Sequence, residues 1–392
     1  MKSNSWAAPQ NIICLLLACL AGCVTPQAAP DKISQMCLAI EPDLSSFQPE
    51  ASLVVSGAET YILDGASGEK IVLPSNPDAN DSYLPSNFIL SPDYQKIAYI
   101  ESRYQSLNGQ KIFVGNALKI WLDNGEIFTA NQWQPNFEYP IEWFDNDRLL
   151  LPTKDDLDGT IILYNPVTGA SERIQPTFPD IYKFDPIPWY QSTNPLPLYN
   201  QEMTRVFYLR FLKDDPESNL EYVLYDLESA AVLWTKTVHL PTICPQWTPA
   251  QDQIIIASQD SSATDYEFFS IDQNGNESKL SDFSSRYTAN YIDGFRLSPD
   301  GQKIAFWLDG RNGTDEAHPH FAIFDLATRQ TTDYCLGPGG RIFWSPDGNQ
   351  VAFMINENDN PEASYTVVLD VKENKAARVA DHLYPVGWFA IK

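Results

Sequence analysis

The sequence is poor in basic residues, cysteine and histidine. It has 26 Lys and Arg against 51 Asp and Glu, with only six cysteines and four histidines. The resulting net charge of −25 repels nucleic acid and favours cationic partners or divalent ions. No two cysteines have the CxxC spacing of a structural zinc site. The composition therefore argues against nucleic-acid binding and against a zinc-stabilised fold.

Long apolar runs are also missing, apart from residues 12–21 near the N-terminus. This run is too short to span a bilayer and has the length of an export signal. It ends in Leu20-Ala21-Gly22-Cys23, which resembles the lipobox of bacterial lipoproteins. We therefore expect a lipoprotein signal peptide over 1–22, a lipid on Cys23, a flexible tether over 23–50 and a folded domain over 51–392. An ordinary cleaved signal peptide with a chance Cys is the alternative.

The lipobox predicts where the protein resides. Residue 24 is Val, whereas an Asp directly after the lipidated Cys would resemble an inner-membrane retention signal. We therefore expect the outer membrane, facing the periplasm. Three cysteines remain beyond Cys23, namely Cys37, Cys244 and Cys335. An oxidising compartment allows one disulfide and one spare thiol among them, and the sequence leaves the pairing open.

A strand–turn–strand pattern recurs along the chain. Its clearest copies are FRLSPDGQKIAFW at 295–307, IFWSPDGNQVAFM at 342–354 and FILSPDYQKIAYI at 88–100. A period of roughly fifty residues built from strands and tight turns predicts a β-propeller. In the turn, Pro presets φ, Asp binds the following amides and Gly accepts positive φ, so we expect these residues to be structural.

Two recurrent positions give the number of blades. An apolar anchor followed seven residues later by an aliphatic residue occurs six times, at Leu90/Ile97, Trp143/Leu150, Tyr199/Val206, Trp247/Ile254, Leu297/Ile304 and Trp344/Val351. An Asp or Asn at a strand end occurs seven times, at Asp64, Asp123, Asn165, Asp226, Asp272, Asp325 and Asp370. The missing seventh anchor is Trp388, four residues before the end of the sequence.

Six anchor pairs against seven strand-end positions predict an all-β, seven-bladed propeller of four-stranded antiparallel blades. A C-terminal strand over about 385–391 would join three strands that start at residue 52, which closes the ring and removes free sheet edges. A six-bladed ring with an extra N-terminal hairpin is the alternative.

The SPDG-x-x-[IV]-[AV]-[FY] core resembles the TolB-like, WD-repeat-like propeller repeats of bacterial envelope proteins. The resemblance covers about residues 52–391. Propellers of this kind serve as protein-docking platforms, as lids on serine peptidases and occasionally as lyases. TolB-like members carry a separate N-terminal domain, and only about thirty residues lie between Cys23 and the first repeat, so TolB's own function is not implied.

The connections between the second and third strands of five blades are acidic. They cover 154–159, 213–219, 259–265, 309–317 and 356–363, and acids are about three times as frequent there as in the whole chain. These loops share one face of the ring, where loops carry function on a rigid scaffold. Solubility alone is the competing explanation for the acids. For a basic partner, the candidate residues are Asp155, Asp156, Asp214, Asp215, Asp315 and Glu316.

Aromatic residues are expected on the same face. They lie on Pro-rich connections and would suit peptide or sugar recognition, unless they pack as a satellite core. The candidates are Trp133, Tyr182, Trp189 and Tyr190. Calcium could use the carboxylates, although no loop has the regular EF-hand spacing. His318 and His320 have a spacing that metals use and are weak candidate ligands.

We expect a non-catalytic, lipid-anchored, monomeric propeller that binds a protein or peptide and needs no cofactor. The alternative is a carbohydrate-active lyase or hydrolase, or a glycan-binding propeller, that uses the central channel. The sequence has no G-x-S-x-G, H-E-x-x-H or P-loop motif. The enzyme alternative requires at least two of the four histidines, His239, His318, His320 and His382, to lie within reach of one metal near the channel.

Overall fold

The computed structural model describes residues 32–42, 51–57, 60–65, 67, 69–72, 81–107, 110–130, 141–152, 161–174, 198–211, 220–238, 245–259, 265–312, 319–356 and 363–389. The chain divides into two compact units, Met1–Pro30 and Asp31–Lys392, and the description below concerns the second. In the described part of the chain, no helix is long and apolar enough to cross a membrane.

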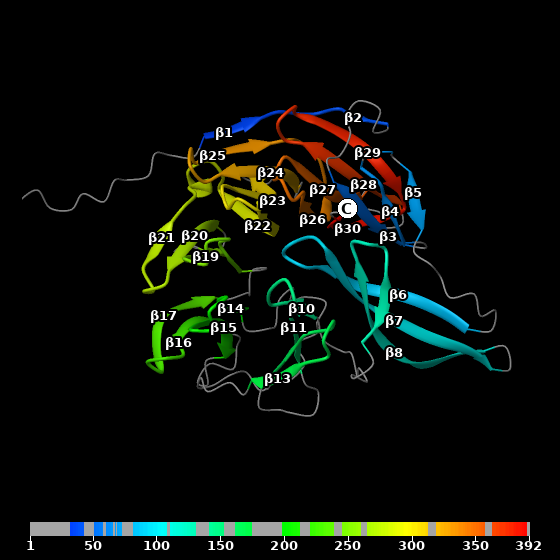
Figure 1. The fold of residues 1–392 in the computed structure, drawn as a ribbon. Coiled ribbons are helices and arrows are strands. Elements are labelled where there is room, and N and C mark those ends of the chain that lie inside the picture. The colour runs from blue at the N-terminus through cyan, green and yellow to red at the C-terminus, as the bar shows by residue number, and fades with distance from the viewer. Residues whose placement is uncertain are drawn as a thin grey trace, which may run out of the picture. The chain divides into compact units, whose positions relative to one another are not determined.

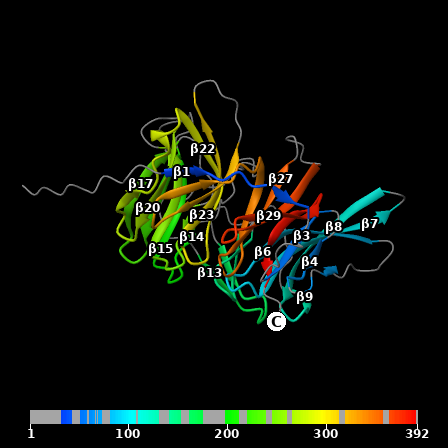
Figure 2. The same ribbon diagram turned by 90° about the horizontal axis from the view of Figure 1, so that it is seen from above.

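Seven antiparallel sheets make up the unit Asp31–Lys392 (Figures 1 and 2). From inner to outer strand, the first four blades are β30 (Tyr384–Phe389), β3 (Ser52–Ser56), β4 (Thr60–Leu63), β5 (Lys70–Val72); β6 (Asp81–Leu90), β7 (Lys96–Leu107), β8 (Gln110–Leu122), β9 (Ile127–Thr129); β10 (Glu142–Trp143), β11 (Leu149–Pro152), β12 (Ile161–Tyr164), β13 (Ser171–Ile174); and β14 (Leu198–Tyr199), β15 (Arg205–Phe211), β16 (Leu220–Asp226), β17 (Ala231–Val238).

The remaining three blades follow in chain order and complete the ring. They are β18 (Gln246–Trp247), β19 (Gln253–Gln259), β20 (Tyr266–Asp272), β21 (Glu277–Lys279); β22 (Ala289–Leu297), β23 (Lys303–Arg311), β24 (His320–Asp325), β25 (Gln330–Asp333); and β26 (Gly339–Trp344), β27 (Gln350–Asn356), β28 (Ser364–Asp370), β29 (Lys375–Asp381). The predicted seven-bladed, four-stranded propeller is confirmed, and the six-bladed alternative is wrong.

The first blade is closed by strands from both ends of the domain. β30 pairs antiparallel with β3, with Trp388 opposite Leu53, and β3 continues into β4 and β5. Trp388 therefore occupies the anchor position that the six complete repeats predict. Inner-strand contacts between β26 and β30 and between β30 and β6 bring the seventh, first and second blades together.

The predicted anchor pairs are cross-strand neighbours in the structure. Leu90 lies opposite Ile97, seven residues later. Tyr199, Trp247, Leu297 and Trp344 likewise pair with the residue seven positions after them. The third blade differs by one residue, because Trp143 lies opposite Leu149 rather than Leu150. The seven-residue interval therefore measures a short turn between the first two strands of a blade.

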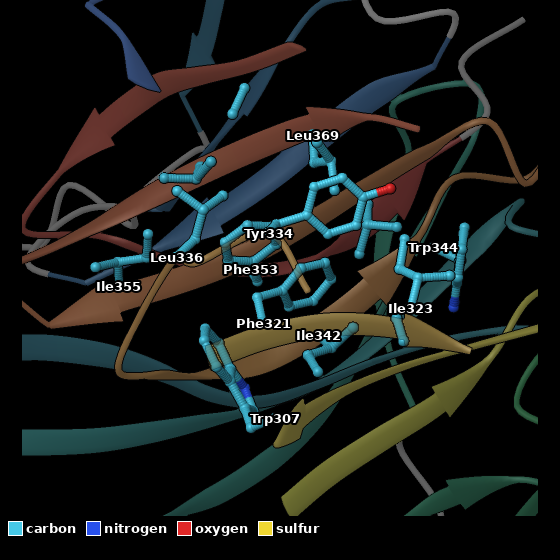
Figure 3. Close-up of a cluster of buried hydrophobic side chains, with 14 of the residues drawn as sticks. Trp307, Phe321, Ile323, Tyr334, Leu336, Ile342, Trp344, Phe353, Ile355 and Leu369 are labelled. Atoms are coloured by element: carbon cyan, nitrogen blue, oxygen red, sulfur yellow. The ribbon is translucent and has the colours of Figure 1, made fainter. Parts of the chain in front are cut away.

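Each blade buries both of its faces. Successive side chains on a strand point to opposite faces, so Val54 joins the core between the first and second blades, and Leu53 and Val55 join the core between the seventh and first. Seven buried clusters follow this rule, one between each pair of adjacent blades. In the cluster between the sixth and seventh, Phe321 and Phe353 stack with ring centroids 4.1 Å apart (Figure 3).

The repeated Asp residues are structural, as predicted. In the SPDG turn, Asp300 accepts hydrogen bonds from the Ser298 hydroxyl and the Gln302 amide, and Asp93 and Asp347 repeat this arrangement. The strand-end acids and amides cap the outer hairpins by accepting backbone N–H groups. The residues that do so are Asp64, Asn165, Asp226, Asp272, Asp325 and Asp370.

An N-terminal strap covers the outer edges of two blades. β1 (Lys32–Gln35) pairs in parallel with β25, and β2 (Ile40–Glu41) pairs in parallel with β29 (Figure 1). Between them, Cys37 forms a disulfide with Cys335, which selects one of the pairings that the sequence left open; Cys244 lies outside the described residues. Residues 32–42 therefore differ from the tether expected over 23–50, because they supply edge strands that the alternating pattern of the blades does not reveal.

Candidate functional site

Most of the predicted site residues lie outside the described residues. The structure therefore does not test the predicted acidic and aromatic surface or the lipidated cysteine. The predicted residues concerned are Cys23, Trp133, Asp155, Asp156, Tyr182, Trp189, Tyr190, Asp214, Asp215, Asp315, Glu316 and His318.

One acid of the predicted acidic loops, Asp309, has a structural role. Its side chain is buried and its carboxylate accepts hydrogen bonds from the guanidinium of Arg311. Because this charge is neutralised within the sixth blade, Asp309 does not contribute an exposed charge to an acidic surface.

His320 belongs to a polar cluster beneath the strap. Its Nδ1 lies 3.4 Å from the carboxylate of Asp333, which also accepts the amide of Cys335 and a side-chain N–H of Gln35. The bond to Asp333 raises the pKa of His320, although burial opposes it. Burial acts to raise the pKa of Asp333, but the bonds from His320 and Cys335 hold it below its usual value. The cluster fastens strap, disulfide and sixth blade together.

The structure supports no metal role for His320. Across the described ranges, no group of three or more His, Cys, Asp or Glu side chains is arranged to hold a metal ion. His320 and His382 are also absent from the lining of the channel pocket described below. His239 and His318 lie outside the described residues, so the histidine condition of the enzyme alternative stays open for them.

Tryptophan hydrogen bonds link the inner strands of neighbouring blades at four of the seven junctions. The indole nitrogen of Trp143 donates to the carbonyl of Ile89, which is the residue before the anchor in the preceding blade. Trp247, Trp344 and Trp388 repeat this bond to the equivalent carbonyls of Leu198, Arg296 and Phe343. Each tryptophan therefore turns toward the preceding blade, and the residue before it points to the other face of the sheet.

The position before the anchor carries a different residue in every blade. Around the ring these residues are Ile89, Glu142, Leu198, Gln246, Arg296, Phe343 and Gly387. Five of them line a pocket of about 360 Å³ together with the adjacent anchors, among them Trp143, Trp344 and Trp388. A volume of this size falls at the lower end of the range of small-ligand sites.

The pocket holds one acid and one base on different blades. Burial raises the pKa of Glu142 to about 7, and the charge of Arg296 opposes that rise. Gln246, on the blade between them, does not contribute to this pair: its amide bonds the Phe295 carbonyl and the Leu297 amide of β22. Glu142 therefore changes charge near neutral pH, with the Arg296 guanidinium lining the same pocket.

Tyr94 extends the pocket to the end of the channel where the SPDG turns lie. It replaces the Gly of SPDG and keeps that residue's left-handed backbone, with φ of 59° against 68° at Gly301 and 71° at Gly348. A non-glycine residue in this conformation costs about 1–2 kcal/mol. Tyr94 and Pro92 line the pocket, so backbone strain coincides with the candidate site.

Sequence comparison returns no relatives: no protein-family model matches the chain, and no curated protein is found to be similar. Among solved structures, the chain is similar to TolB from Acinetobacter baumannii at 13% identity, covering 92% of this chain and 97% of that one, with a TM-score of 0.43. It is similar to an oligogalacturonate lyase from Vibrio parahaemolyticus at 12% identity, covering 85% and 87%, with a TM-score of 0.53.

A third similar structure is the acylaminoacyl peptidase of Pyrococcus horikoshii. It is 12% identical, the match covers 76% of this chain and 46% of that one, and the TM-score is 0.47. The lyase match shows a shared fold. Since one fold hosts such different proteins, function has to be argued from the site.

Sequence reasoning missed Glu142, Arg296 and Tyr94. The signals were present but small: SPDY departs from SPDG at Tyr94, and the position before the anchor is charged in only two copies. A register that turns each anchor toward the preceding blade turns the residue before it toward the next blade, at the inner end of the strand. The alternation of side chains along the inner strands could therefore have identified Glu142 and Arg296.

Proposed function

We propose that this protein is a non-catalytic binding scaffold of the bacterial cell envelope that takes up a protein or peptide segment at its channel. The observation that carries the proposal is the channel pocket. It has aromatic walls and one charge of each sign, all on hydrogen-bonded inner strands. Rigid aromatic side chains bury area at little entropic cost, and opposite charges orient a chain that has both kinds of group.

A peptide segment fits this pocket better than a sugar or a nucleotide phosphate. Arg296 would pair with a carboxylate of the partner, and Glu142 with an ammonium or guanidinium group. Tryptophan faces add a cation–π contribution for the basic group. A basic segment also suits a chain with a net charge of −25, because long-range attraction speeds its approach.

The location and the second surface are further parts of the proposal. Leu20-Ala21-Gly22-Cys23 supports a lipid on Cys23 and a place at the outer membrane, facing the periplasm. The acidic loops around Asp155, Asp214 and Asp315 would form an additional contact for a basic partner at the other face. Membrane fractionation of Cys23→Ala tests the anchor, because release into the soluble fraction is expected and persistent membrane association contradicts it.

Capture from the native envelope tests the binding function. The full chain is cross-linked in cells and the captured proteins are compared between wild type, Glu142→Gln with Arg296→Gln, and a set with Asp155, Asp156, Asp214, Asp215, Asp315 and Glu316 changed to Asn or Gln. Weaker capture of one partner by the pocket pair, without a loss of thermal stability, supports the proposal. Equal recovery by all three chains contradicts it, and capture of glycan alone favours the carbohydrate alternative.

A further inference from the structure

The hairpin of β7 and β8 is the longest of its blade, and β6 accompanies it only as far as Gln105. These strands have 12 and 13 residues and are the longest among the described elements. Figures 1 and 2 both show β7 and β8 running outward, away from the strands of the other blades. We call residues 103–107 and 110–115 the distal ribbon; residues 108–109, which connect its strands, lie outside the described residues.

The distal ribbon exposes apolar side chains on both of its faces. In the strand register, Tyr104 lies opposite Phe113 and Gln105 opposite Ile112, which places Phe113 and Ile112 on opposite faces. The exposed apolar side chains are Leu107 at 57%, Ile112 at 44%, Phe113 at 52% and Val114 at 50%. Exposed apolar residues in a contiguous group mark an interaction site.

The ribbon also has the opposite charge from the rest of the chain. No acid occurs from residue 102 to residue 122, where three basic residues lie, in a chain with twice as many acids as bases. Lys119 pairs with Glu101 at 3.3 Å, and Lys111 is the basic residue nearest the exposed apolar side chains of the ribbon. β6 runs beside β7 as far as Gln105, which lies opposite Asp81 and is level with Ile112, so the acid-free stretch is that of β7 and β8 themselves. The corresponding loops of five other blades are acidic.

We propose that the distal ribbon inserts into the interface of a phospholipid bilayer with anionic headgroups. A bilayer surrounds an inserted hairpin and covers both apolar faces at once, whereas a docked protein covers one face or one edge. Lys111 lies beside Ile112 and Phe113, and a mixture of basic and apolar side chains is what the interface takes up. At about 3.3 Å per residue, Lys111–Val114 spans about 10–13 Å, close to the depth of interfacial insertion.

Vesicle flotation tests the proposal with a matched pair of variants. Val114 and Val167 are exposed to similar extents, 50% and 56%, but Val167 lies in a turn of the third blade. In the full chain carrying Cys23→Ala, Val114→Asp should weaken binding to phosphatidylglycerol-containing vesicles about tenfold, since it removes an apolar contact and adds a charge of the same sign as the headgroups. Val167→Asp should leave binding unchanged. Equal effects of the two substitutions would overturn the proposal.

Two further measurements separate a lipid surface from other occupants. Lys111→Gln should reduce the preference for anionic over phosphatidylcholine vesicles about fivefold, because each cation near an anionic surface contributes about 1 kcal/mol. In cells, p-benzoylphenylalanine in place of Phe113 should form adducts with phospholipid. Adducts only with a protein, only with a second copy of the chain, or with nothing at all would overturn the proposal.

Discussion

The indole nitrogen of Trp388 donates a hydrogen bond to the carbonyl of Phe343, 3.0 Å away, from the last inner strand to the one before it. Trp388 is fully buried and pairs across the sheet with Leu53. One side chain therefore joins the seventh blade, the C-terminal strand and the N-terminal strand, and ring closure depends on it.

Trp388→Phe should lower the free energy of unfolding by about 1–3 kcal/mol, because it leaves a buried carbonyl without its donor and removes packing volume. Urea unfolding measures the change. Trp234→Phe is the control, since that indole bonds an exposed carboxylate of Glu277 and its loss should cost much less. Equal losses at the two positions would show that the ring does not depend on the Trp388 bond.

The Cys37–Cys335 disulfide should stabilise the domain by holding the strap to the sixth blade. The bond joins residues 298 apart in sequence, so it restricts the unfolded chain strongly. Cys335→Ser should cost about 2–5 kcal/mol in urea unfolding. Dithiothreitol should lower the stability of the wild type to that of the variant and leave the variant itself unchanged. A wild-type curve that does not respond to reductant would contradict this role.

The His320–Asp333 contact should make the strap depend on pH. Because the pKa of His320 is raised in the folded state, its contribution to stability is complete below its usual pKa of 6.5 and is lost as pH rises through the folded value. Melting temperatures at pH 6 and pH 8 should therefore differ more for the wild type than for His320→Asn. An equal difference in melting temperature for the wild type and His320→Asn would mean that the His320–Asp333 pair does not contribute to the pH dependence.

Glu142 should add a second, separate pH dependence. Its pKa is raised to about 7, so the neutral carboxyl is favoured in the folded state and stability falls as pH rises from 4.5 to about 7. Above that value the contribution is constant. Glu142→Gln should remove the fall in this window while keeping the dependence that His320 supplies. A titration of the wild type that matches the Gln variant between pH 4.5 and 7 would contradict a buried, proton-binding Glu142.

The left-handed conformation of Tyr94 should lower the stability of the fold. Tyr94→Ala and Tyr94→Gly lose the same ring, and only Gly accepts φ of 59° without strain. The Gly variant should therefore be more stable than the Ala variant by about 1 kcal/mol, the reverse of their usual order within a strand. Chemical denaturation of the two variants measures the difference. An Ala variant that is as stable as the Gly variant would show that the turn relaxes.

The repeats predict the fold well because they are governed by local chemistry. Turns of Ser, Pro, Asp and Gly recur wherever the backbone needs them, and the interval between Leu90 and Ile97 is the register of two paired strands. The truncated copy at Trp388 is enough to predict closure by β30 and β3. Continuous apolar runs along the second and third strands then follow from the burial of both faces of each blade.

The candidate site is harder to predict because it depends on positions where the repeats differ. Glu142 and Arg296 come from blades that are far apart in sequence, and only the closed ring brings them to one pocket. The strap is missed for a different reason. β1 and β2 are short strands added to existing edges, so neither has the alternating pattern of an independent blade.

The most direct test of the account is photo-cross-linking from the channel pocket in living cells. With p-benzoylphenylalanine in place of Tyr94 in the full chain, the account predicts an adduct with one defined protein or peptide. That adduct should weaken when Glu142→Gln and Arg296→Gln are added, while the melting temperature does not fall. An adduct whose yield does not change with the two substitutions would contradict a binding site at the channel. The absence of any protein adduct would contradict it as well.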